Sequence, residues 1–142
     1  MKRTIIFLFL SFVFCGLCFS QETVNVTVEV TNVAVNGGKV YLAIFSNNAS
    51  FQKEDPEIAF ELQSDKAAIS REVSLLPGEY VVSAFQDANN NVKLDYGLFG
   101  IPKELVGISN YSGKGFPSKS FDKQKILIDS KVEKIIIGLY KF

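Results

Sequence analysis

One short stretch of the chain carries oxygen-bearing side chains at alternate positions, a pattern that could bind a hard cation. Asp87, Asn89, Asn91, Lys93 and Asp95 fall at positions one, three, five, seven and nine of a calcium-binding loop. In such a loop position seven contributes its backbone carbonyl, so a lysine there is compatible with binding. The spacing therefore predicts a calcium site, and calcium is the candidate cofactor.

Two positions depart from the helix–loop–helix calcium motif. Val92 stands at position six, where that motif has glycine for a sharp turn, and Leu98 stands at position twelve in place of a bidentate glutamate. Glu104 is the candidate for the missing carboxylate. With few charged ligands we expect a low affinity, roughly 0.1 to 1 mM, as in extracellular calcium modules. The alternative is an Asx-rich turn, whose side chains bond their own backbone without an ion.

Histidine is absent from the chain, and the two cysteines, Cys15 and Cys18, lie near the N-terminus. Histidine general bases, histidine-dependent triads and histidine metal sites are therefore excluded. The carboxylates of Asp87, Asp95 and Glu104 leave room for a hydrolase that divides the acid and base roles between two acidic groups. We rank this hypothesis below a non-catalytic one, because a small chain without tryptophan offers no evident substrate cleft.

The first twenty residues have the three parts of a secretory signal. A basic start precedes an uncharged apolar run over residues 4–19, and small residues stand before a polar stretch. We expect cleavage after Ser20, which removes both cysteines and leaves residues 21–142 as a single domain in the periplasm or the medium. The run is shorter than the roughly 20 residues of a spanning helix, so no membrane span is expected after cleavage. A retained anchor and an acylated lipoprotein are the less favoured alternatives.

The charge pattern does not indicate binding to a polyanion. Basic and acidic residues are equal in number, 15 of each. No basic stripe indicates nucleic-acid binding, and no basic amphipathic helix indicates a membrane surface. We therefore expect a small ligand or a protein of the cell envelope as the partner.

After the signal, the pattern is that of short strands separated by turns. Valines alternate with polar residues over residues 24–30, which predicts a strand with one buried face. A further segment, residues 58–62, fits either a strand or a helical turn. Other strands are expected at residues 39–45, 67–75, 80–85, 125–128 and 132–140. The fold class is therefore all-β, a single antiparallel β-sandwich of about seven strands.

The turn residues suggest how these strands connect. We expect the first two strands to pair as a hairpin through Asn36-Gly37-Gly38, because asparagine and glycine accept positive φ. Pro77-Gly78 has the signature of a type II turn with glycine in the left-handed position. The last two strands are expected to pair with each other as an antiparallel pair.

One long loop separates the strand ending near residue 85 from residue 120. A connection of this length is usually functional when it is ordered. Its recurring apolar residues indicate that it folds against the sandwich, with a short helical turn at residues 103–105. Its bends are assigned to Gly97, Gly100, Gly107, Gly113, Gly115, Pro102 and Pro117. The candidate binding side chains on it are Tyr96, Lys103, Asn110 and Tyr111, with ordinary packing as the alternative for the tyrosines.

The same region carries a resemblance to a known family. The matching residues are Leu76-Pro77-Gly78-Glu79-Tyr80, the Asx stretch with Leu94, Gly100-Ile101-Pro102-Lys103-Glu104, Gly107, Ser109-Asn110 and Phe116-Pro117. With them the chain resembles the bacterial family called domain of unknown function 2141, departing at Val92, where the family pattern leads us to expect glycine. The resemblance implies an exported β-sandwich similar to transthyretin-like or immunoglobulin-like domains. It implies no known activity.

Three function hypotheses follow. The first is a non-catalytic binding module of the cell envelope, with the loop over residues 87–117 as its recognition surface, because a rigid sandwich with one elaborate loop is a usual arrangement for a binding site. The alternative is a structural or assembly protein that pairs with a partner through a sheet edge. The carboxylate-dependent hydrolase comes third.

Overall fold

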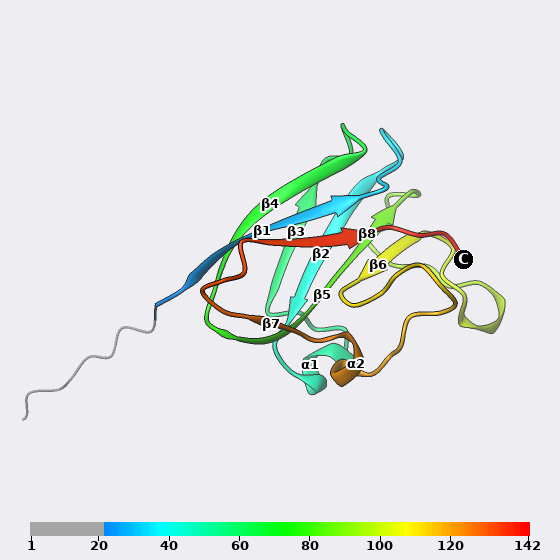
Figure 1. Cartoon of the computed structure of the whole chain (residues 1–142). Helices are drawn as coiled ribbons and strands as arrows, with labels where there is room; N and C mark the ends of the chain where they lie inside the picture. Colours follow the sequence, from blue (N-terminus) through cyan, green and yellow to red (C-terminus); the bar gives the residue numbers. More distant parts are fainter. Residues whose placement is uncertain (1–21) are drawn as a thin grey trace, which may run out of the picture.

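The computed structural model describes residues 22–142, which form two β-sheets packed face to face (Figure 1). The predicted signal peptide, residues 1–20, lies outside the described residues. One sheet has the strand order β4-β1-β8; the other has the order β3-β2-β5-β6, with β7 also pairing with β5. The predicted all-β sandwich is confirmed. Within residues 22–142 no helix has the length and apolar character needed to cross a membrane.

The elements that the structure describes are short and are joined by turns. In chain order they are β1 (Val24–Thr31), β2 (Lys39–Phe45), α1 (Asn48–Gln52), β3 (Ile58–Leu62), β4 (Ala68–Leu75), β5 (Gly78–Asp87), the 3-10 turn η1 (Leu98–Gly100), β6 (Leu105–Ile108), α2 (Phe121–Gln124), β7 (Ile126–Ile128) and β8 (Lys134–Gly138). The ambiguous segment, residues 58–62, is a strand.

Alternation along the strands places the core between the two sheets. On β1 the valines at 26, 28 and 30 are buried and the residues between them are not. Complete burial of a side chain of this size stabilises the fold by about 1.5–3 kcal/mol relative to leaving it exposed. The facing sheet contributes Val40, Leu42 and Ile44 of β2 with Val82 and Ala84 of β5.

The expected hairpin between the first two strands is wrong. β1 pairs antiparallel with β4 and parallel with β8, whereas β2 pairs with β3 and β5 in the other sheet. The turn at Asn36 and Gly38 does have positive φ, but it belongs to a connection that crosses between sheets. Buried Gln86 holds that connection: its Oε1 accepts from Ala34 N at 2.9 Å, and its Nε2 donates to Ala34 O and Gly38 O. β1 and β2 face each other across the core from opposite sheets, whereas the two strands of one hairpin lie side by side in one sheet.

Three other local expectations are also corrected. β7 pairs with the start of β5, and β8 pairs with β1, so the last two strands do not pair with each other. Gly78 is outside the left-handed region and begins β5, so it does not serve a type II turn. Residues 103–105 form no helical turn, because β6 begins at Leu105 and pairs with β5.

Gly107 of β6 lies directly against the end of β8. Val106 and Tyr140 exchange two backbone hydrogen bonds, at 3.0 and 2.9 Å, which join β6 to the segment after β8. A Cβ at Gly107 would lie 2.3 Å from the carbonyl oxygen of Gly138 and 2.9 Å from Ile137 Cγ2. Gly107 is therefore required for a close backbone approach; its φ is not positive and it does not provide a bend.

This geometry makes Gly107→Ala strongly destabilising. We expect a loss of at least about 3 kcal/mol in the free energy of unfolding, the upper range for overpacking, because the clash is with backbone. Gly100→Ala is the control, since Gly100 has φ +71 but nothing within 4 Å of its added Cβ. It should lose only about 1 kcal/mol, the cost of a left-handed alanine. Urea denaturation measures both, and equal losses would contradict the close-approach interpretation.

Candidate functional site

The candidate site lies on the outer face of the five-stranded sheet. Along β5, alternate side chains leave the core and point to this face, and they are Val81, Ser83, Phe85 and Asp87. The long loop and the two short helices cover part of it, and Figure 1 shows α1 and α2 side by side at one end. There Phe51 of α1 makes edge contacts with Phe45 and Phe121.

Between this face and the long loop is a groove of about 870 Å³. Its lining is mainly apolar, and aromatic side chains come both from the sheet and from the covering segments. These aromatic residues are Phe51, Phe85, Tyr96, Phe99, Tyr111 and Phe116. A volume of this size falls within the range of roughly 300–1,000 Å³ that is typical of ligand pockets.

The depth of the groove comes from two small side chains at its floor. Ala43 of β2 and Ser83 of β5 are directly opposed across the strands, and Ser83 is opposed on its other side by Ile108 of β6. The neighbouring outward positions on the same two strands carry Phe45 and Phe85. A small pair between large residues leaves a hollow in the sheet surface.

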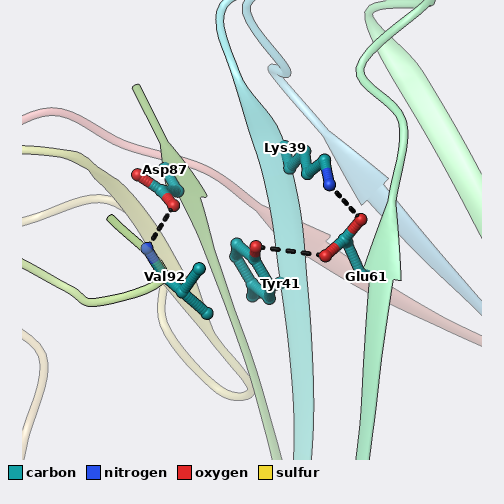
Figure 2. A network of polar contacts seen from close by, with 5 residues as sticks. All are labelled: Lys39, Tyr41, Glu61, Asp87 and Val92. Carbon is teal, nitrogen blue, oxygen red and sulfur yellow. Dashed lines mark hydrogen bonds and ion pairs between the residues drawn. The ribbon is translucent and has the colours of Figure 1, made fainter. Parts of the chain in front are cut away.

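One end of the outer face is a polar cluster that Figure 2 shows from close by. Tyr41 stacks on Phe85 with ring centroids 5.2 Å apart and donates a 3.2 Å hydrogen bond to Glu61. Lys39, two residues before Tyr41 on the same face, forms an ion pair with Glu61. The hydrogen bond to Glu61 raises the pKa of Lys39, and the same bond lowers the pKa of Glu61. Sequence reasoning missed this cluster, because its members come from three strands, β2, β3 and β5.

Two buried carboxylates hold the loop that walls the groove. Asp87 ends β5 and is fully buried; its oxygens accept from Asn91 N at 3.2 Å and Val92 N at 2.7 Å, and Figure 2 shows the second bond. Glu104 precedes β6 and is 5% exposed; it accepts from the backbone N–H groups of Ala88 and of residue 95, both at 3.1 Å. The part of the long loop between β5 and β6 is thereby held by a buried carboxylate at each of its two ends.

The predicted calcium ligands are brought together as a hydrogen-bonded set of Asx turns. Asn89 Oδ1 accepts from Asn91 N, and Asn91 Oδ1 accepts from Lys93 N. The amide nitrogens of Asn89 and Asn91 both donate to Asp95 Oδ2, at 2.6 and 2.8 Å. In this arrangement donors, not oxygens, face Asp95, and within residues 22–142 no three acidic side chains converge as a metal-binding group. These bonds are those of the Asx-turn alternative, and the calcium site stays a prediction.

Val92 has a left-handed backbone, with φ +62. A β-branched side chain is disfavoured in this region, because Cβ crowds the following carbonyl oxygen. The bond from its N–H to buried Asp87 holds it there, while its own side chain is 63% exposed. The sequence departure at this position is thus a real site of strain.

The four predicted binding side chains do not form one cluster. Tyr96 and Tyr111 line the groove. Tyr111 also donates to Gly115 O at 2.5 Å and packs edge-on against Tyr140, so part of its role is packing. Lys103 is exposed and is not part of the groove lining. Asn110 is exposed, has φ +58 and donates to the backbone oxygen of residue 125, which links the turn after β6 to the residue before β7.

The tip of the long loop does not fold down as its apolar sequence led us to expect. Leu98 is 83% exposed and Phe99 is 97% exposed, and Phe99 has φ +63. Phe116, on the second half of the loop, is 65% exposed. Both phenylalanines line the groove, so large apolar side chains stand at its mouth.

Sequence reasoning also missed the groove floor, Ala43 and Ser83. Their outward placement could have been read from the alternation of each strand. Their pairing could not, because it depends on the register between strands far apart in the sequence.

Comparison with known families agrees with the motif resemblance. Residues 28–136 match the model of DUF2141, described as an uncharacterized protein conserved in bacteria. The chain belongs to this family. No curated protein and no solved structure matches the chain. The DUF2141 match includes both clamping carboxylates and the groove floor.

The strain at Val92 predicts that Val92→Gly stabilises the protein. Glycine adopts positive φ without a Cβ clash, so we expect a gain of about 0.5–1 kcal/mol after its larger chain entropy is offset. Val35→Gly is the matched control, because Val35 is also exposed in a turn but has no positive φ. That variant should lose stability. A loss with Val92→Gly in urea denaturation would contradict the strain argument.

The calcium prediction is tested by thermal unfolding of residues 21–142 with calcium, magnesium or chelator. A calcium site would raise the melting temperature at millimolar calcium but not magnesium, and Asp95→Ala would remove that response. Asp129→Ala is the control, since Asp129 accepts from Lys131 N in a separate turn. An unchanged melting temperature would leave the Asx turns as the whole explanation.

Proposed function

We propose that residues 21–142 act as an exported, non-catalytic binding module whose groove takes a ligand with an apolar surface. The observation that carries this is the hollow over Ala43 and Ser83, walled by aromatic side chains of a clamped loop. A preformed apolar pocket binds with little ordering cost. The exposed tip at Leu98 and Phe99 supports the same idea, because strained, exposed residues tend to occur at functional sites.

The export part of the proposal rests on the sequence. The basic start, the apolar run over residues 4–19 and the small residues before residue 21 are those of a secretory signal. A chain without cysteine after residue 18 depends on its core instead of disulfides. We propose the periplasm or the medium as its location.

The two other hypotheses receive less support. For the hydrolase, Asp87 and Glu104 are buried, and each accepts two backbone N–H groups, so we assign both a structural role. For strand addition, β3 and β4 are sheet edges, but β4 carries exposed Arg71 and Glu72, and charged edges oppose pairing. The groove therefore carries the proposal.

The proposal is tested by filling the groove. Ala43→Leu places a larger side chain on the floor and should weaken binding of the neutral apolar dye N-phenyl-1-naphthylamine at least tenfold. Ala59→Leu is the matched control. Ala59 of β3 is paired with Ala43 of β2 and lies on the same face of the sheet, but it is outside the groove lining. It should leave binding unchanged. Absence of dye binding to the parent protein, or equal binding by the two variants, would overturn the proposal.

A further inference from the structure

The exposed charges of residues 88–120, which form β6 and the loop segments on both sides of it, all have one sign. The exposed charged residues of this segment are the four lysines Lys93, Lys103, Lys114 and Lys119. The two acidic residues of this loop are turned to its own backbone and amides: Asp95 is partly buried, and Glu104 is buried. The acidic groups thus hold the loop, and the basic groups face solvent.

This basic surface stands out against the rest of the domain. Without the basic residues at 2 and 3, the chain has 13 basic and 15 acidic residues. The positive surface of the loop therefore differs in sign from the net charge of the mature domain. Charged groups at a site steer ligands of opposite sign and reject those of the same sign.

Two of the lysines belong to the groove itself. Lys93 follows the Asx turns, and Lys119 precedes α2, where its backbone oxygen accepts from Gln52 Nε2 at 2.6 Å. Glu54 is the one acidic residue in the groove lining. Burial, followed by the charge of Glu54, raises the pKa of Tyr96, which places Glu54 near that tyrosine. The groove thus combines an apolar, aromatic surface with a surplus of positive charge.

Large apolar side chains extend this surface beyond the groove. Leu98, Phe99 and Phe116 are mostly exposed, and the two phenylalanines belong to the lining. Phe99 keeps a left-handed backbone without burying its ring in this chain. A ligand with a long apolar part would cover these rings.

From this combination we propose that the ligand is an anionic amphiphile, with its aliphatic chain in the groove and its carboxylate or phosphate head at Lys93 and Lys119. This rests on the proposed function and names the ligand class of the same groove. The aliphatic chain removes apolar surface at the floor and mouth from water. The head forms charge-assisted contacts with the two ammonium groups.

The test compares amphiphiles with one tail and different heads, each below its micellar concentration, as competitors of N-phenyl-1-naphthylamine. Laurate should displace the dye at a concentration at least tenfold lower than dodecyltrimethylammonium does. The preference should shrink when salt is raised from 50 to 500 mM, because exposed charges are screened. Lys93→Gln/Lys119→Gln should weaken laurate binding about tenfold more than it weakens dye binding, because the neutral dye has no charged head for the two ammonium groups to contact. The matched control, Lys66→Gln/Lys131→Gln, removes two exposed lysines outside the groove lining and should change neither.

The outcomes separate this inference from the proposed function. Equal displacement by the anionic and cationic amphiphiles, with dye binding intact, overturns the anionic ligand and leaves the binding module standing. No dye binding at all overturns the proposed function first. Flotation with vesicles of phosphatidylglycerol and phosphatidylcholine then identifies the source of the amphiphile. Co-flotation that is lost in Leu98→Ser/Phe99→Ser assigns it to a membrane surface, and laurate binding without co-flotation assigns it to a dispersed amphiphile.

Discussion

The carboxylates of Asp87 and Glu104 control the outer surface of this protein. Each is buried, and each accepts two backbone N–H groups from the loop between them. A carboxylate removed from water is costly unless it is hydrogen-bonded, so the loop must keep the conformation that supplies those donors. Because the clamps lie at the end of β5 and just before β6, the loop is held over the sheet. The part of the groove wall that precedes β6 depends on this arrangement.

The sheet and the long loop each supply a different part of the groove. The sheet supplies a rigid floor with a small cross-strand pair, Ala43 and Ser83, and the loop supplies aromatic rings and lysines. Two loop residues, Val92 and Phe99, have left-handed backbones that their side chains disfavour. Both residues thus depart from the backbone conformation that their side chains prefer, and both lie in the segment that walls the groove. Such departures are expected at functional regions.

Prediction from sequence succeeded where the signal was local. The valine alternation of residues 24–30 located β1, and the apolar segment of residues 39–45 located β2. Prediction failed for the pairing of the strands. β1 and β2 were expected to form a hairpin, but the structure places them in opposite sheets. A period of two says which residues share a face, but it is the same for every possible partner strand. Gly107 was misread for a similar reason, since the Gly138 carbonyl that it accommodates is distant in the sequence.

The sequence by itself determined the positions of most of the described strands, though not of β6, and it determined the exclusion of histidine chemistry, the family and the Asx composition of the loop. Each of these depends on residue type and local spacing. The tertiary structure decided which side chains meet. It opposed Ala43 to Ser83, buried Asp87 and Glu104, and left Phe99 in solvent. These outcomes depend on the register and packing of segments far apart in the chain. No local pattern encodes such contacts, so the groove became visible only in the folded molecule.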